Sequence, residues 1–167
     1  MVSLRQDCRR NRIFIPGPSS EYFEILARGR ARYSFLPGAT GPSKACDLYD
    51  RQILDVVVDL RVDSPTFGQW EGVELLSSDR NAVLLPIGVG HAFVALEDDT
   101  TVCYLVSDVF TPDKEFGVHP LDADLAIDFG VDADELLLSP KDQAAPSLSE
   151  ALAEGLLPHV NDLEPVK

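Results

Sequence analysis

The chain is poor in cysteine and in positive charge, and both shortages exclude functions. Its 167 residues include three cysteines, Cys8, Cys46 and Cys103, and no CxxC pair. An odd number without metal-type spacing argues against a disulfide scaffold and predicts a protein of the reducing cytoplasm. Fourteen lysines and arginines stand against 28 acidic residues, which gives a net charge of −14. A surface this acidic repels phosphate backbones, so we expect no nucleic-acid partner.

Several familiar signals are also missing. No apolar run approaches the ~20 residues of a membrane-spanning helix, and residues 1–14 carry charge without the apolar stretch of a signal peptide. We therefore expect no membrane partner. The absence of GxSxG and of a glycine-rich phosphate loop argues against a serine hydrolase and a P-loop protein. The three histidines, His91, His119 and His159, form no ligand cluster by spacing, so we expect no metal.

The few basic residues are concentrated at the start of the chain. Residues 1–33 hold seven arginines and three acidic residues, whereas the remainder holds seven basic and 25 acidic residues. Three interpretations stay open. The arginines face an anionic small molecule, they pair with the acidic body of this chain or a partner chain, or they are solvated charges that keep the protein soluble.

The length and the 45% hydrophobic content predict a single domain over 1–167, with 1–20 as a loosely ordered arm and 158–167 as a tail. Residues 53–60 alternate with period two, and Leu54, Val56, Val58 and Leu60 form a wholly apolar face. The pattern predicts further strands over 22–26, 32–36, 73–76, 82–85, 91–96 and 101–106. Short strands at this spacing are typical of a sandwich or barrel. A short helix is expected over 148–157, with Ser147 or Ser149 as its N-cap.

Two polar residues stand inside predicted strands. Asp55 interrupts an apolar strand, and His91 begins another after a proline–glycine turn. Strand interiors seldom hold charge without a partner. Asp55 is therefore either the partner of His91 or an acid at an exposed edge, as Asp59 can be.

Four segments in order resemble the dTDP-4-dehydrorhamnose 3,5-epimerases, a family of deoxysugar-nucleotide epimerases with the cupin fold. They read DVVVDLRVDSPTFGQWEGVEL (55–75), LLPIGVGHAF (84–93), VCYLVSDVFTP (102–112) and SPKDQAAPSLSEAL (139–152). The resemblance extends over about 54–152, decays before Lys44, and places a shorter segment there than the family has. It implies an all-β, cupin-type antiparallel sandwich or barrel (a jelly roll) with a short C-terminal helix. It also implies a homodimer that exchanges strands.

The resemblance also implies site residues. Tyr104 falls on the family's catalytic tyrosine, His91 on its strand histidine, and Asp55 on the carboxylate that orients this histidine. Lys44 falls on the lysine near the enolate oxygen, and Asp142 on the aspartate that supports the base. The family needs no metal or redox cofactor.

The base itself differs. The family reads RGLH, with an arginine that falls on Arg30 or Arg32, and its base histidine falls on Tyr33 of RARYS (30–34). Histidine titrates near pH 6.5 and tyrosine near 10. Arg30 and Arg32 would have to lower the tyrosine pKa by ~3 units, worth ~4 kcal/mol, for Tyr33 to act as a base at neutral pH.

Three functions follow from this resemblance. The first is an isomerase that removes and returns a proton next to the ketone of a nucleotide-linked 4-keto-6-deoxysugar, with a dTDP-sugar as the expected partner. The second is a repurposed epimerase fold that performs cyclisation, dehydration or tautomerisation on a non-nucleotide substrate in a specialised pathway. The third is a non-catalytic binding protein.

Overall fold

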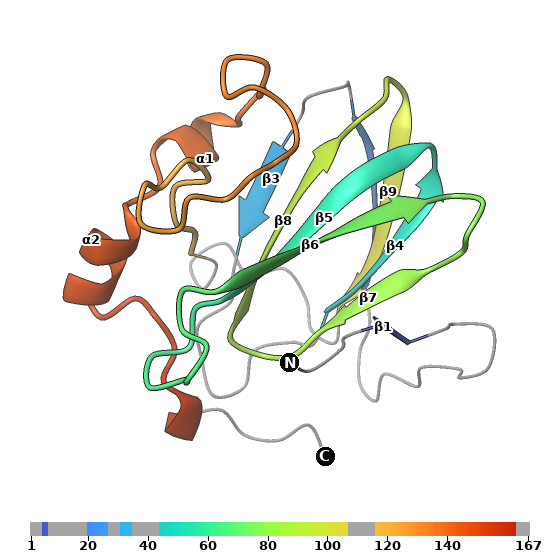
Figure 1. Ribbon diagram of the computed structural model, residues 1–167. Helices are drawn as coiled ribbons and strands as arrows, with labels where there is room; N and C mark the ends of the chain where they lie inside the picture. Colours follow the sequence, from blue (N-terminus) through green and yellow to red (C-terminus); the bar gives the residue numbers. More distant parts are fainter. Residues whose placement is uncertain (1–4, 7–19, 27–30, 35–43, 107–115, 163–167) are drawn as a thin grey trace.

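A computed structural model of the chain describes residues 5–6, 20–26, 31–34, 44–106 and 116–162. Side chains are described for residues 51–103 and 116–161. In the described part, nine antiparallel strands form two sheets, with a C-terminal segment of turns and short helices beside them (Figure 1). No described helix has the length and apolar character needed to cross a membrane.

The two sheets pack face to face. One has the order β1-β7-β4-β9-β2, and the other has the order β3-β8-β5-β6. Both stay open at their edges, so the fold is a sandwich and not a closed barrel. The bounds in chain order are β1 Arg5–Gln6, β2 Ser20–Leu26, β3 Ala31–Ser34, β4 Lys44–Asp50, β5 Gln52–Asp59, β6 Trp70–Leu76, β7 Ala82–Leu85, β8 Val89–Ala95 and β9 Thr100–Val106.

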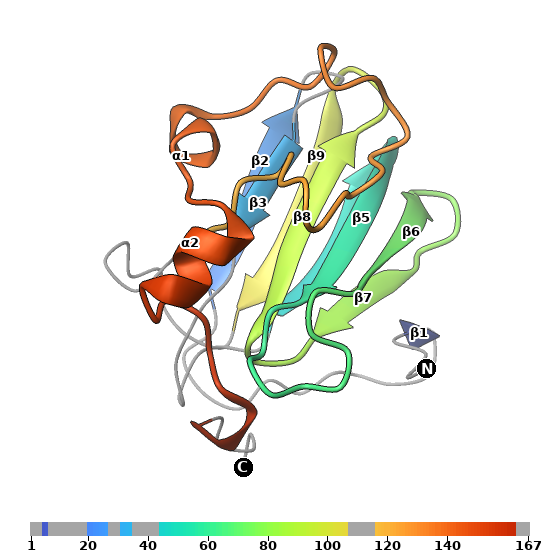
Figure 2. The ribbon, with the colours of Figure 1, turned by 60° about the vertical axis from the view of Figure 1, so that its left-hand side comes forward.

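The four-stranded sheet is covered on both faces. Its inner face packs against the five-stranded sheet, where Ile53 and Val57 join Leu85 and Val102 in one apolar cluster. Its outer face is covered by the C-terminal segment, orange to red in Figures 1 and 2. Val56, Val58, Leu60, Ala92 and Val94 are fully buried there. Burial on both faces explains why β5 and β8 are almost continuously apolar.

The strands predicted from alternation are confirmed, with shifted ends. The strand expected over 73–76 begins at Trp70. The one expected over 32–36 is described from Ala31 to Ser34, and residues 35–43 lie outside the described part. The expected arm, 1–20, contains β1, which pairs with β7, and the first residue of β2. The rest of that arm is not among the described residues.

The predicted C-terminal helix was too long. Helix α2 spans Leu148–Ala153, and Ser147 caps it in a capping box with Glu150. It ends early because Gly155 adopts a left-handed φ of +67°. A second helix, α1 (Pro140–Gln143), was not predicted, and Ser139 caps it.

Residues 158–162 of the expected tail, 158–167, lie in the described part of the chain and contact the loop after β5. Val62 donates its N–H to the carbonyl of Pro158 at 2.7 Å, and Val160 donates to the carbonyl of Val62 at 3.2 Å. His159 Nδ1 and Asp63 Oδ2 are 2.9 Å apart. The 3-10 helix η2 (Val160–Asp162) follows.

A carboxylate organises the connection from β5 to β6. Asp59 accepts hydrogen bonds from the backbone N–H, Nε and Nη2 of Arg61 and from the hydroxyls of Ser64 and Thr66, at 2.6–3.1 Å. Burial alone would raise the pKa of Asp59, but these donors outweigh it and hold the pKa well below its usual range. The network therefore stabilises the fold fully above the unfolded pKa, near 3.9, and progressively less as pH falls below it.

We expect Asp59→Asn to lower the free energy of unfolding by about 2–4 kcal/mol at pH 7, because Arg61 loses its charged partner. Because the unfolded carboxyl takes up a proton at low pH, the loss should shrink by about 1 kcal/mol at pH 3. Urea unfolding at both pH values measures this. Asp134→Asn, which removes the same charge at an exposed position, should change stability by less than about 0.5 kcal/mol. Equal losses for the two variants would contradict the prediction.

Candidate functional site

Asp55 and His91 meet between the two sheets. His91 Nε2 lies 2.7 Å from Asp55 Oδ2, and the side chains are 3% and 0% exposed. The contact predicted from the sequence is therefore present, and Asp55 is not an edge acid. Within the described part of the chain, no donor reaches the other oxygen, Oδ1 of Asp55. A carboxylate that holds Nε2–H selects the tautomer whose Nδ1 carries the lone pair.

The register explains how these residues meet. In the β5–β8 pair, Asp55 is the partner of Phe93 and Val57 is the partner of His91. Asp55 and His91 are therefore diagonal neighbours on the inner face, a spacing that long polar side chains can bridge.

Two further predicted residues occupy positions that face the same layer. Position 104 lies two residues along β9 from Val102, which is fully buried between the sheets. Alternation along a strand gives both positions the same face. Lys44 in β4 is the register partner of Leu85, another residue of the inner cluster. Positions 44 and 104 thus belong to the inner face of the five-stranded sheet, which packs against the sheet that holds Asp55 and His91.

Strand β3 divides the remaining predicted residues between two faces. Arg32 is the register partner of Phe93, so position 32 belongs to the inner face. Tyr33 is the partner of Ala92, a residue of the outer cluster, so position 33 belongs to the face under the C-terminal segment. Ser34 is the partner of His91. Arg30 lies outside the described residues.

Asp142 lies in the C-terminal segment, away from the inner face. Its side chain is 4% exposed. The hydroxyl of Ser139 donates to Asp142 Oδ2 at 2.6 Å and accepts from the Asp142 N–H at 3.1 Å. Figures 1 and 2 both place α1 toward the β3 end of the four-stranded sheet. Asp142 lines a cavity together with Phe116 and Leu156, which pack against the outer cluster, whereas His91 and Asp55 lie on the inner side.

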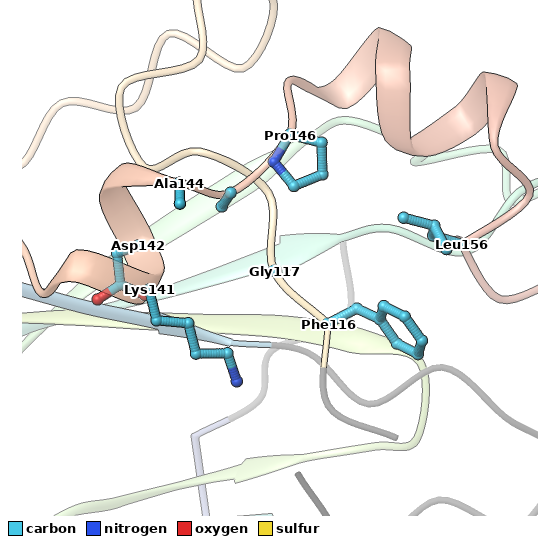
Figure 3. Close-up of a pocket in the computed structure, with 8 residues that line it drawn as sticks. Phe116, Gly117, Lys141, Asp142, Ala144, Pro146 and Leu156 are labelled. Atoms are coloured by element: carbon cyan, nitrogen blue, oxygen red, sulfur yellow. The ribbon is translucent and has the colours of Figure 1, made fainter. Parts of the chain in front are cut away.

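A cavity of about 300 Å³ lies beside Asp142. Figure 3 shows Lys141 and Asp142 at one end of it and Phe116 and Leu156 at the other. Its walls are mostly apolar, and Gly117, Ala144, Ala145 and Pro146 complete them. Of the predicted site residues whose side chains the structure describes, Asp142 lines it, and Asp55 and His91 do not.

The other two histidines have local contacts. His119 Nδ1 accepts from the backbone N–H of Leu121 at 3.1 Å, and His159 contacts Asp63 at the surface. Among the described residues, no group of three His, Cys, Asp or Glu side chains is placed to hold a metal ion.

Sequence reasoning missed Phe93. Its ring centroid lies 5.6 Å from that of His91, with 47° between the ring planes. The signal was available, because residues two apart in a strand share a face. The donors around Asp59 were also missed, although Arg61, Ser64 and Thr66 follow it within seven residues.

Comparison with solved structures defines the class of protein. A 4-keto-6-deoxy sugar epimerase from the novobiocin cluster of Streptomyces spheroides is 43% identical, with a TM-score of 0.83, and the match covers 87% of this chain and 72% of that one. A 3'-monoepimerase from Streptomyces bikiniensis, solved with dTDP-quinovose, is 39% identical, with a TM-score of 0.83 over 89% and 74% of the two chains. The fold is that of the cupin-type sugar epimerases.

The sequence comparisons identify the family. The family model for dTDP-4-dehydrorhamnose 3,5-epimerase matches residues 39–150. A dTDP-4-dehydrorhamnose 3-epimerase of Streptomyces niveus is 48% identical over 80% of this chain and 64% of its own length. A 3,5-epimerase of Mycolicibacterium smegmatis is 50% identical over 64% of this chain and 51% of its own. The chain belongs to the dTDP-4-dehydrorhamnose 3,5-epimerase family and spans about half to two thirds of the length of these relatives.

The buried Asp55–His91 pair leads us to a prediction about the stability of the fold. Asp55→Leu leaves a buried imidazole without its carboxylate, so we expect the free energy of unfolding to fall by about 1–3 kcal/mol. Replacing both partners, as Asp55→Leu with His91→Leu, removes the unmatched polar group and should recover part of that loss. Urea unfolding of the two variants tests this. A double variant less stable than the single one would show that the pair does not behave as a unit.

Proposed function

We propose that this protein is an isomerase that epimerises a nucleotide-linked 4-keto-6-deoxysugar, with a dTDP-sugar as its substrate. One observation carries the proposal: a buried imidazole–carboxylate pair lies between the sheets. The register supports it, since positions 44 and 104 belong to the inner face of the opposing sheet. The relatives of this chain are named as epimerases of such sugars. No observation favours a repurposed enzyme or a non-catalytic binding protein.

The chemistry needs a base, an acid and a stabiliser of negative charge. The ketone at C4 acidifies the hydrogens on C3 and C5. A base removes one proton, and the electrons of that C–H bond form an enolate. An acid then returns a proton to the opposite face of the same carbon, which inverts it. The reaction moves protons only, so it requires no electron acceptor.

We assign the base to His91, because an imidazole whose Nε2–H is held by a carboxylate carries its lone pair on Nδ1, where it can accept a proton. Asp55 orients the ring and stabilises the imidazolium that forms. Tyr104, on the opposing sheet, is the acid. Lys44 and Arg32 occupy inner-face positions and supply positive charge for the enolate oxygen.

A competing assignment keeps the roles that the resemblance implies. In it Tyr33 is the base and Asp142 supports it. The β3 register supports His91 over Tyr33, since position 33 belongs to the outer side.

We also propose a cytoplasmic homodimer. The resemblance implies the dimer, and each open sheet offers edge strands for pairing with a second copy. Cys103, which forms no disulfide, fits a reducing compartment.

Deuterium incorporation tests the activity. The protein is incubated with dTDP-4-keto-6-deoxyglucose in D₂O, and label at C3 and C5 is measured by NMR. We expect label well above a protein-free control, and a loss of about 10²- to 10⁴-fold in Tyr104→Phe and in His91→Asn. Cys103→Ala, at the neighbouring position on the opposite face of β9, should retain the wild-type rate. No label above the protein-free control would refute the proposed activity.

The same assay separates the two candidate bases. With His91 as the base, Tyr33→Phe should keep most of the labelling rate, because position 33 lies on the far side of the sheet. Loss of labelling in Tyr33→Phe, together with its retention in His91→Asn, would assign the base to Tyr33 instead.

A further inference from the structure

Four residues form a compact unit on the inner face of β5 and β8. Asp55 stands directly across from Phe93, and Val57 stands directly across from His91. The polar residues therefore occupy one diagonal of the unit, and the apolar residues occupy the other.

Phe93 and Val57, the apolar diagonal, flank the hydrogen-bonded pair of Asp55 and His91. Phe93 is 1% exposed and Val57 is 7% exposed, and both belong to the apolar cluster between the sheets. The Phe93 ring lies tilted at 47° beside the imidazole, with 5.6 Å between the ring centroids. It thus borders both partners of the hydrogen bond, Asp55 across the strand pair and His91 along its own strand.

From this arrangement we propose that Phe93 is a positioning residue that keeps water away from the Asp55–His91 hydrogen bond and fixes the tilt of the imidazole. Water at this bond would compete for Nε2–H and weaken the pairing, whereas a dry apolar wall strengthens it. The effect of Phe93 on catalysis rests on the proposed function. The exclusion of water by Phe93 does not, so the two effects can be tested in separate experiments.

The surface pair of His159 and Asp63 gives an internal reference. It joins the same two chemical groups at 2.9 Å, but its side chains are 51% and 61% exposed. Water should therefore reach the His159 ring freely and the His91 ring very slowly.

Proton NMR of the full-length protein in water tests the proposal without any substrate. We expect a downfield imidazole N–H resonance from His91, identified by its loss in His91→Asn, that shows slow exchange with water. Phe93→Leu should broaden this resonance beyond detection. Phe129→Leu is the matched control. Phe129 belongs to the C-terminal segment, is 2% exposed and packs against the other face of the same sheet, so its replacement should leave the resonance in place.

Two results would overturn the proposal. One is a resonance that exchanges as slowly in Phe93→Leu as in the wild type. The other is a wild-type His91 N–H that exchanges with water as fast as that of His159, a result that does not depend on the folding of Phe93→Leu. Circular dichroism checks folding, and if Phe93→Leu does not fold, Phe93→Met replaces it with a flexible side chain.

Labelling kinetics add the functional consequence. In Phe93→Leu we expect kcat to fall about 10- to 100-fold, as on removal of groups that orient metal-binding histidines, with KM unchanged. Phe129→Leu should keep both values. A wild-type protein without epimerase activity would refute the proposed function, and the NMR result would still decide the role of Phe93.

Discussion

The hydrogen bond between His91 and Asp55 depends on one register of β5 against β8. A slip of one residue would carry Asp55 to the outer face, into the cluster around Val56 and Val58, and leave a carboxylate among buried apolar side chains. Both faces of the four-stranded sheet are covered, so neither offers water to a misplaced charge. The apolar residues thus enforce the register, and the register brings the polar pair together.

The two buried carboxylates of β5 differ in the number of hydrogen bonds that they accept from the described residues. Asp59, at the end of the strand, accepts from five donors in the next loop. Asp55, in the middle, has His91 as its donor in the described part of the chain. With its hydrogen bonds, Asp59 stabilises the connection from β5 to β6. A buried carboxylate is costly unless it is hydrogen-bonded, so the burial of Asp55 depends on the imidazole of His91.

The four-stranded sheet also separates the candidate residues into two groups. His91, Asp55 and the positions of Tyr104 and Lys44 face the layer between the sheets, while Asp142 belongs to the C-terminal segment and position 33 to the sheet face beneath it. Chemistry at the inner group proceeds in a layer lined by apolar side chains, where charges act strongly on one another. For this reason we place the acid and base of the proposed reaction there.

Near neighbours and ordered motifs in the chain were enough to predict the alternating strands, a serine N-cap at Ser147 or Ser149, and the resemblance to the epimerases. The pattern predicted Asp55 as the partner of His91 but left an exposed edge acid as the alternative. Asp55 and Asp59 share a face, and both lie diagonal to the histidine in the register. Tertiary structure decided, since Arg61, Ser64 and Thr66 engage Asp59 and leave Asp55 to the imidazole. Helix α1 and the face of position 33 were likewise set by packing between segments far apart in the chain, which local patterns do not encode.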